Sequence, residues 1–257
     1  MKTISTKCMQ ITKTYCNISQ IQTSLIEDAE IKIHINDYLF ISFICIKDNL
    51  EFLAIGYLIN IGVNANQIKT IKIKENDVFV QCDISKENFF YLINRVDIIP
   101  TCQSIYLNNK NNSSKIQIPF NSAKVNLNPE KLSKIIESID LENNIFKAYL
   151  AYEKRILFSS DINAKNAIYK VFGSIFKINN EPNMGVESRI ESILIINFPL
   201  SIEILKQILM YKITFIVFID SPSFTTVKYA QKYGLTIIEM KSYKEFKIYT
   251  HHSRIKN

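Results

Sequence analysis

The stretch that decides the fold is residues 192–240, which read SILIINFPL-SIEILKQILMYK-ITFIVFIDSP-SFTTVKYAQKYG-LTIIEM. Three short apolar runs rich in β-branched residues alternate here with two amphipathic segments, the second of which ends at Gly234. The apolar runs are typical of buried strands and the amphipathic segments of helices. Strand–helix–strand–helix–strand order with short links predicts a parallel sheet with right-handed crossovers, and hence an α/β domain.

The carboxyl ends of such strands are where parallel sheets bind ligands. The three ends carry Asn197-Phe198-Pro199, Asp220-Ser221-Pro222-Ser223 and Met240-Lys241-Ser242. Expected helix N-termini could hold phosphate through their backbone N–H groups; they lie at Ser201, at 221–223 and at 161–163. The C-terminal tail, residues 241–256, adds cations. Two interpretations fit this pattern. The residues form a site for an anionic ligand, or the serines only cap their helices and the basic tail holds no ligand.

Upstream of this stretch, residues 24–98 predict a smaller α+β unit. Two strand-like runs flank Asn36-Asp37, a pair suited to a tight hairpin turn. A helix follows, with Asp48 as its expected cap and Gly62 at its end. Residues 1–23 are polar and are expected to form a loosely held lead.

Composition narrows the class of protein. The chain has 257 residues and a net charge of +7, but its Lys and Arg are scattered, without a zinc finger or an aromatic RNA-binding motif. Nucleic-acid binding is therefore the least favoured hypothesis. Its five glycines form neither a Walker A motif nor a GxGxxG motif, and its apolar runs are too short to span a bilayer.

The cysteines offer one candidate nucleophile. No two of the five form a CxxC pair, which suits reduced thiols in a cytoplasmic protein, and no bound metal is expected. Cys102 alone follows a proline at the root of a long polar loop, residues 100–118, where a thiol would be reachable. From the residues alone, Cys102 is either a reactive thiol or an incidental one.

Six short motifs occur in order along most of the chain. They are NLEFLAIGYLINIGV at 49–63, PTCQSI at 100–105, Asp161 with Asn166-Ala167, Lys170 and Gly173, then Ser201 and Glu203, then Pro222, Val227 and Ala230, and last Gly234 and Thr236 with IYTHHSRI at 248–255. Together they resemble the FdhD/NarQ family, the formate dehydrogenase accessory sulfurtransferases.

The resemblance implies a function. Members of this family take sulfane sulfur from a cysteine desulfurase as a cysteine persulfide. They pass it to the molybdenum or tungsten bis(molybdopterin guanine dinucleotide) cofactor, which apo formate dehydrogenase then receives. By this resemblance the persulfide cysteine is Cys102, and the cofactor-contacting stretch is Met240, Lys241, Ser242, Tyr243, Lys244 and Glu245.

The resemblance also implies an architecture. Residues 119–257 would form a cytidine-deaminase-like domain with a parallel or mixed sheet, following the smaller α+β domain at 24–118 that ends in the Cys102 loop. The protein would be a cytoplasmic homodimer that binds neither nucleic acid nor membrane.

The chain departs from the family at polar positions. Ile105 stands in place of the second loop cysteine, and Asn163-Ala164-Lys165 replace the expected Gly-Arg-His. The alternative hypothesis is therefore a degenerate homologue that keeps the fold but acts as a nucleotide- or protein-binding module.

Overall fold

The structure is a computed structural model that describes residues 3–12, 17–85, 87–89, 92, 126–140, 145–152, 155–178, 192–211 and 213–256. Its larger sheet has six strands in the order β12-β11-β10-β9-β7-β8. Their bounds are β7 (Phe146–Tyr152), β8 (Arg155–Asp161), β9 (Ile193–Ile196), β10 (Phe215–Phe218), β11 (Thr236–Ser242) and β12 (Glu245–Ile248).

The predicted parallel core of this sheet is confirmed. β9, β10 and β11 run parallel in register, so that Phe215 lies between Ile193 and Thr236. The pattern at 192–240 does not include the antiparallel additions, which the resemblance allowed for as a mixed sheet: β7 and β8 extend the sheet on one side and β12 on the other. The sheet is therefore mixed.

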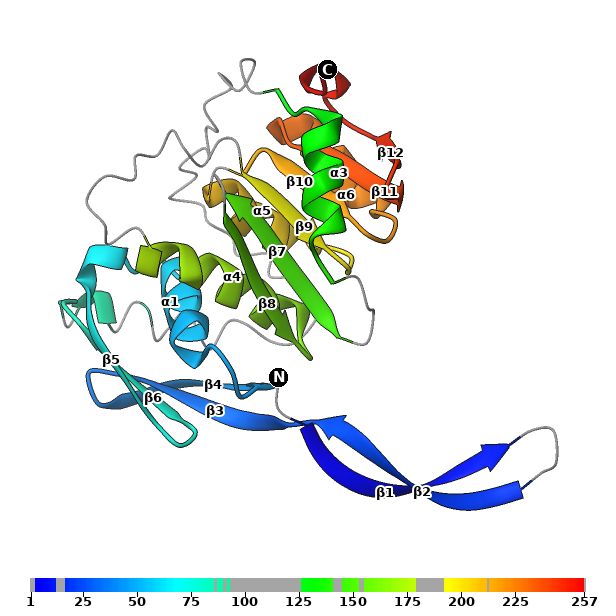
Figure 1. The fold of residues 1–257 in the computed structure, drawn as a ribbon. Coiled ribbons are helices and arrows are strands. Elements are labelled where there is room, and N and C mark those ends of the chain that lie inside the picture. Colours follow the sequence, from blue (N-terminus) through cyan, green and yellow to red (C-terminus); the bar gives the residue numbers. More distant parts are fainter. Residues whose placement is uncertain are drawn as a thin grey trace.

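Helices cover both faces of the six-stranded sheet (Figure 1). One face packs against α4 (Ala164–Ile178), α5 (Ile202–Met210) and α6 (Phe224–Tyr233), through side chains such as Leu194 and Ile216. The opposite face packs against α3 (Pro129–Glu137), through Ile195 and Val217. Neighbouring strand residues thus serve opposite cores, which explains why these strands are apolar throughout.

A second sheet of four strands, ordered β4-β3-β6-β5, forms the smaller unit. Its strands are β3 (Asp28–Ile35), β4 (Tyr38–Ile46), β5 (Ile68–Lys74) and β6 (Asp77–Cys82). The predicted hairpin is confirmed, because Asn36 and Asp37 both have positive φ, at 49° and 71°. Helix α1 (Leu50–Asn60) packs on this sheet through one buried apolar stripe, Leu50, Leu53, Ala54, Tyr57 and Leu58.

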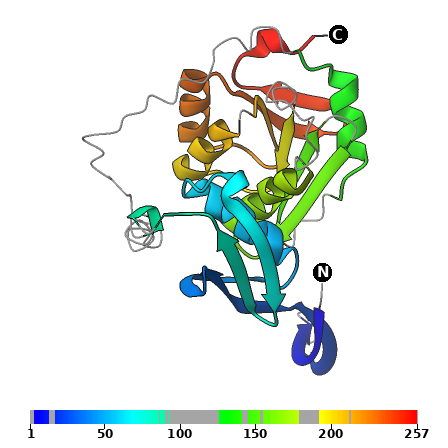
Figure 2. The same cartoon turned by 90° about the vertical axis from the view of Figure 1, so that its left-hand side faces the viewer.

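The N-terminal stretch differs from the expected loose lead. Residues Thr3–Thr12 and Asn17–Ile26 form two paired strands, β1 and β2. Both strands contain several threonines and isoleucines, which favour strands even where the overall composition is polar. The hairpin projects from the rest of the molecule in both views (Figures 1 and 2).

The two units meet where α1 crosses α4. A Cβ added at Gly56 would lie 1.9 Å from the backbone oxygen of Tyr169, and one added at Gly173 would lie 2.0 Å from that of Phe52. Real atoms cannot approach so closely. Each helix therefore needs a glycine where the backbone of the other passes, and these are glycines of two separate motifs.

A buried lysine joins the same two units. The Lys170 ammonium on α4 lies 2.8 Å from the Asp161 carboxylate and 2.7 Å from that of Asp48, and it donates to the backbone oxygen of Ile46. The prediction that Asp48 caps α1 is therefore wrong. Asn49 occupies the cap position without a side-chain bond, and Asp48 serves Lys170 instead.

The predicted domain limits at residues 23 and 118 remain predictions. The boundary at 118/119 lies outside the described residues, as does the whole loop 100–118.

The close crossing of the helices predicts the effect of one methyl group. Gly173→Ala should lower the free energy of unfolding by roughly 1–3 kcal/mol, because the added Cβ must push α1 and α4 apart. In an ordinary helix the same change is stabilising. Urea unfolding measures the difference, with Lys165→Ala, at a half-buried position of the same helix, as the control. A Gly173→Ala protein as stable as the wild type would contradict the tight crossing.

Candidate functional site

The predicted nucleophile, Cys102, lies outside the described residues, and so does Ile105. Two other cysteines are unsuited to sulfur transfer. Cys45 on β4 and Cys82 on β6 are buried, and burial raises their pKa values to about 12 and about 11. A thiol reacts as its thiolate, so both are inert at neutral pH.

The predicted cofactor-contacting stretch, residues 240–245, lies at the carboxyl end of β11. Met240, Lys241 and Ser242 complete β11, Tyr243 and Lys244 form the turn, and Glu245 begins β12. The strand pairing is irregular between Met240 and Ser242. All six residues are exposed except Met240, which is half-buried against the core beneath α3.

A buried carboxylate anchors this hairpin, and sequence reasoning missed it. Glu239 is 2% exposed and accepts hydrogen bonds from three side chains. They are the Lys241 ammonium at 2.5 Å, the Tyr249 hydroxyl at 2.6 Å and the Ser221 hydroxyl. Ser221 follows β10 and Tyr249 follows β12, so one carboxylate ties three neighbouring segments together.

These donors set the ionisation of the cluster. The hydrogen bond from Lys241, with those from Ser221 and Tyr249, lowers the pKa of Glu239 to about 2. The same contacts raise the pKa values of Lys241 and Tyr249. Glu239 is therefore a carboxylate at physiological pH, and the Lys241 side chain is held at a fixed place on the hairpin.

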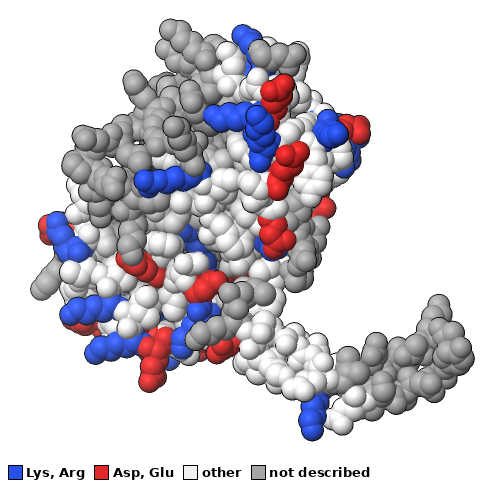
Figure 3. Space-filling model, viewed as in Figure 1, with Lys and Arg blue, Asp and Glu red and all other residues white. Residues whose placement is uncertain are grey.

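The hairpin carries further cations in line with Lys241. Lys244 lies in the turn and Lys247 on β12, and both are exposed. Exposed ammonium groups that lie close together in the chain are suited to phosphate or diphosphate groups. Over the face seen in Figure 3, acidic and basic side chains of the described residues are otherwise interspersed, without a large patch of one sign.

The helix N-termini considered as phosphate sites have their own caps. Ser223 accepts from the Thr226 N–H, Ser201 from the Ile204 N–H and Asn163 from the Lys165 N–H. The capping interpretation of these residues is the one that the structure supports.

Other motif residues also have structural partners. Thr250 accepts from the Ile237 N–H and donates to the Leu235 oxygen. Arg254 is 7% exposed and donates to the Gly234 oxygen and to the Thr236 hydroxyl. The chain end is thereby fastened beside the start of β11, which fixes where the 240–245 hairpin emerges.

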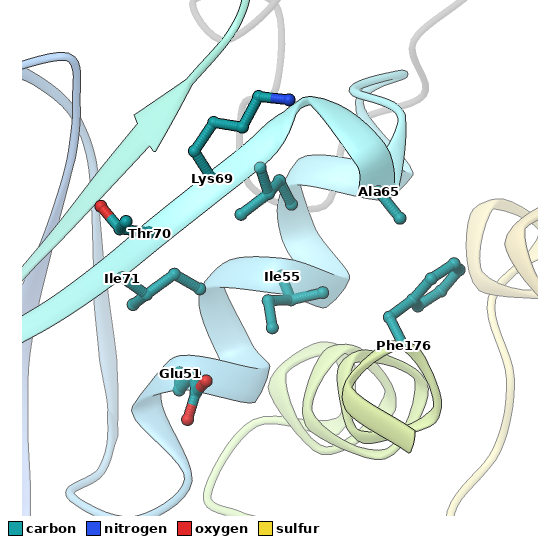
Figure 4. A pocket seen from close by; sticks show the side chains of 8 residues that line it. Glu51, Ile55, Ala65, Lys69, Thr70, Ile71 and Phe176 are labelled. Atoms are coloured by element: carbon teal, nitrogen blue, oxygen red, sulfur yellow. The ribbon is translucent and has the colours of Figure 1, made fainter. Parts of the chain in front are cut away.

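Two pockets lie elsewhere on the molecule. One, of about 120 Å³, lies between α1, β5 and α4, with Ile55, Ile71 and Phe176 around it and Glu51 and Lys69 at its rim (Figure 4). The other, of about 440 Å³, lies between α3 and strands β7 and β8. Residues 240–245 line neither pocket, and the first is smaller than the roughly 300 Å³ of a typical ligand site.

The described residues also limit the class of site. They contain no group of three or more His, Cys, Asp and Glu side chains placed to hold a metal ion. Among the same residues, no helix has the length and apolar character needed to cross a membrane.

The comparisons with known proteins agree with this mixed α/β scaffold. The sequence pattern of the FdhD/NarQ family matches residues 26–256, and the chain belongs to that family. It is 23% identical over 243 residues to the sulfur carrier protein FdhD of Wolinella succinogenes, covering 90% of this chain and 82% of that one. It is 21% identical over 254 residues to FdhD of Bacillus subtilis, covering 93% of each chain.

A solved structure has the same fold. It belongs to a protein described as a formate dehydrogenase accessory protein from Desulfotalea psychrophila, with a TM-score of 0.71 and 18% identity over 99% of both chains. The predicted family is thus confirmed.

The Glu239 cluster predicts a pH dependence of stability. The pKa of Glu239 in the folded protein lies below the ordinary value of 4.5. The ionised Glu239 therefore stabilises the fold above about pH 4.5, and this contribution is lost as the pH falls towards about 2. Glu239→Gln should be less stable at neutral pH and should lose less stability on acidification over this window. Urea unfolding at several pH values tests this, with the exposed Glu245→Gln as the control. Parallel curves for wild type and Glu239→Gln would contradict the prediction.

Proposed function

We propose that this chain is a sulfur carrier that takes persulfide sulfur onto Cys102 from a cysteine desulfurase. It passes the sulfur to a molybdenum or tungsten bis(molybdopterin guanine dinucleotide) cofactor destined for formate dehydrogenase. The observation that carries the proposal is the family match over residues 26–256, with relatives named sulfur carrier proteins, in a chain that keeps a cysteine at the family's loop position.

Sulfur uptake is a balanced exchange. The Cys102 thiolate attacks the outer sulfur of the desulfurase persulfide, forming a new S–S bond while the old one breaks. The desulfurase cysteine leaves as a thiolate, and Cys102 becomes the persulfide. The exchange involves no net oxidation or reduction, so the protein needs no redox partner for this step.

The 240–245 hairpin would hold the cargo. Its guanine dinucleotides carry diphosphates, and Lys241, Lys244 and Lys247 offer ammonium groups to them. Glu239 would act as a positioning residue, because it holds Lys241 at 2.5 Å while remaining buried itself. The cofactor supplies the metal chemistry as the substrate, and the protein supplies position and charge.

The remaining parts of the proposal follow the family. The residues from 119 on would form a cytidine-deaminase-like domain, and the working protein would be a cytoplasmic homodimer that meets the desulfurase and apo formate dehydrogenase in turn.

A second candidate function rests on the sequence departures. Ile105 and Asn163-Ala164-Lys165 replace polar residues of the family pattern, whereas the apolar skeleton and the fold are kept. Such a chain could bind a nucleotide or a partner protein without carrying sulfur.

A Cys102→Ala variant separates the two functions. Sulfur transfer predicts that the wild-type chain gains about 32 Da, one sulfur atom, after incubation with a cysteine desulfurase and cysteine, and that Cys102→Ala does not. The variant should also fail to restore formate dehydrogenase activity in a strain lacking the native carrier, yet still bind GDP in calorimetry. Restored activity with Cys102→Ala would overturn the sulfur-carrier proposal and favour the binding module.

The matched variant for that experiment is Lys244→Glu. It should accept sulfur like the wild type but bind GDP less tightly, whereas Lys72→Glu, the same charge change on β5 of the smaller sheet, should leave both properties unchanged. Equal GDP binding by all three proteins would remove the hairpin from the proposed cargo site.

A further inference from the structure

Phe224 is an exposed aromatic residue that packs on no core. Its side chain is 81% exposed at the first position of α6, directly after the cap Ser223. It belongs to none of the three hydrophobic clusters, and among the described residues it contacts no other aromatic ring. A single apolar side chain on a surface needs no explanation in itself, but this one lies beside the candidate site.

The fold places Phe224 on the same face of the sheet as the Glu239 carboxylate. Ile237 packs in one core with Ala230 of α6, and alternate residues of β11 share a face, so Glu239 also projects on the side of α6. Helix α6 lies beside β11 and begins where the parallel strands end (Figure 1). Because the Cα–Cβ bonds of a helix tilt towards its N-terminus, the Phe224 side chain leaves its helix towards this edge.

Two contacts show how close Phe224 lies to the cations of the 240–245 hairpin. The Ser221 hydroxyl and the Lys241 ammonium both contact Oε1 of Glu239, so these two groups are neighbours. Phe224 follows Ser221 by three residues, which limits the separation of their Cα atoms to roughly 11 Å. Phe224 and Lys241 therefore belong to one small region of the surface.

Exposed aromatic side chains gather at this edge. Of the six that are exposed among the described residues, three are Phe224, Tyr243 in the turn of the hairpin and Tyr249 after β12. Phe224 is the most exposed of these three, at 81% against 49% and 43%, and the Tyr249 hydroxyl is already held by Glu239. Flat rings beside ammonium groups are a combination that suits nucleotides, because a base stacks on a ring while the phosphates meet the cations.

We infer that Phe224 is a binding residue for the cargo, on which a flat heteroaromatic ring stacks while the attached diphosphate meets the lysines of the hairpin. The inference rests on the proposed function, because it takes this edge of the sheet as the place of the guanine dinucleotide. The cargo has two kinds of flat ring, guanine and pterin, and either can stack on a phenyl ring. Phe224 carries no charge, so it acts on the ring and not on the phosphates.

Ligands that carry the ring and the diphosphate separately test the inference. Calorimetry on the full-length chain uses GDP, inorganic pyrophosphate and neopterin, which is a pterin without phosphate. Phe224→Ala should weaken the binding of GDP or of neopterin about five- to a hundredfold and leave that of pyrophosphate unchanged. Lys244→Glu should weaken the binding of GDP and of pyrophosphate. The control, Tyr38→Ala, removes a 66% exposed ring from β4 of the smaller sheet and should change none of these affinities.

A tryptophan at the same position reports stacking directly. The chain contains no tryptophan, so Phe224→Trp introduces the only one. This variant should bind GDP as tightly as the wild type, and its fluorescence should be quenched by the ligand whose ring stacks on the indole but not by pyrophosphate. Tyr38→Trp is the matched control, and none of the three ligands should quench its fluorescence.

The outcomes separate the inference from the proposed function. Weaker binding of GDP by Phe224→Ala, with pyrophosphate unchanged, supports the inference and identifies the ring as guanine, whereas the same result for neopterin identifies the pterin. Unchanged binding of both ring ligands overturns the inference but leaves the proposed cargo site standing, and an equal loss of pyrophosphate binding also overturns it. A wild-type chain that binds none of the three ligands overturns both. Sulfur uptake at Cys102, measured on the same variants, tests the carrier function by itself.

Discussion

Two helix backbones touch where α1 crosses α4, and the arrangement of the two sheets depends on this contact. Gly56 and Gly173 leave no room for a Cβ, and Lys170 sits 0% exposed beside them, bridging Asp48 and Asp161. Removing one partner from a buried ion pair costs about 3–5 kcal/mol, because a charge is left without compensation. The crossing therefore joins the two units by close backbone contact and by a buried ion pair.

This contact gives several residues of the family motifs a structural role. Gly56 belongs to the first motif, whereas Asp161, Lys170 and Gly173 belong to the third, and the structure brings them together across more than a hundred residues of chain. Thr250 and Arg254 likewise fasten the C-terminal end to the start of β11. These motif residues therefore hold the scaffold together.

The sequence was sufficient for the elements whose periodicity is strong. The parallel strands at 192–240 and the turn at Asn36-Asp37 were predictable, because β-branched runs and positive-φ residues each indicate one local structure. The β1–β2 hairpin was not predicted, since the many polar residues of 1–23 indicated a loosely held segment. Strands β7 and β8 escaped notice as well, because their place in the sheet depends on distant partners.

The candidate site was likewise only partly predictable from the sequence. The exposed lysines of the 240–245 stretch were found by resemblance, but Glu239 was not. Its partners Ser221 and Tyr249 lie 18 and 10 residues away in sequence, and a single carboxylate in an apolar strand gives no signal of them. Only the fold shows that this carboxylate is held by three donors.

The proposal as a whole depends on Cys102 being the cysteine that carries sulfur. The most direct measurement is the alkylation rate of each cysteine in the native protein, resolved by peptide mass spectrometry at neutral pH. We expect Cys102 to react first, while Cys45 and Cys82, whose pKa values burial raises to about 12 and about 11, stay unmodified until the protein unfolds. If Cys102 reacts no faster than the other four cysteines, it is not the sulfur-carrying residue.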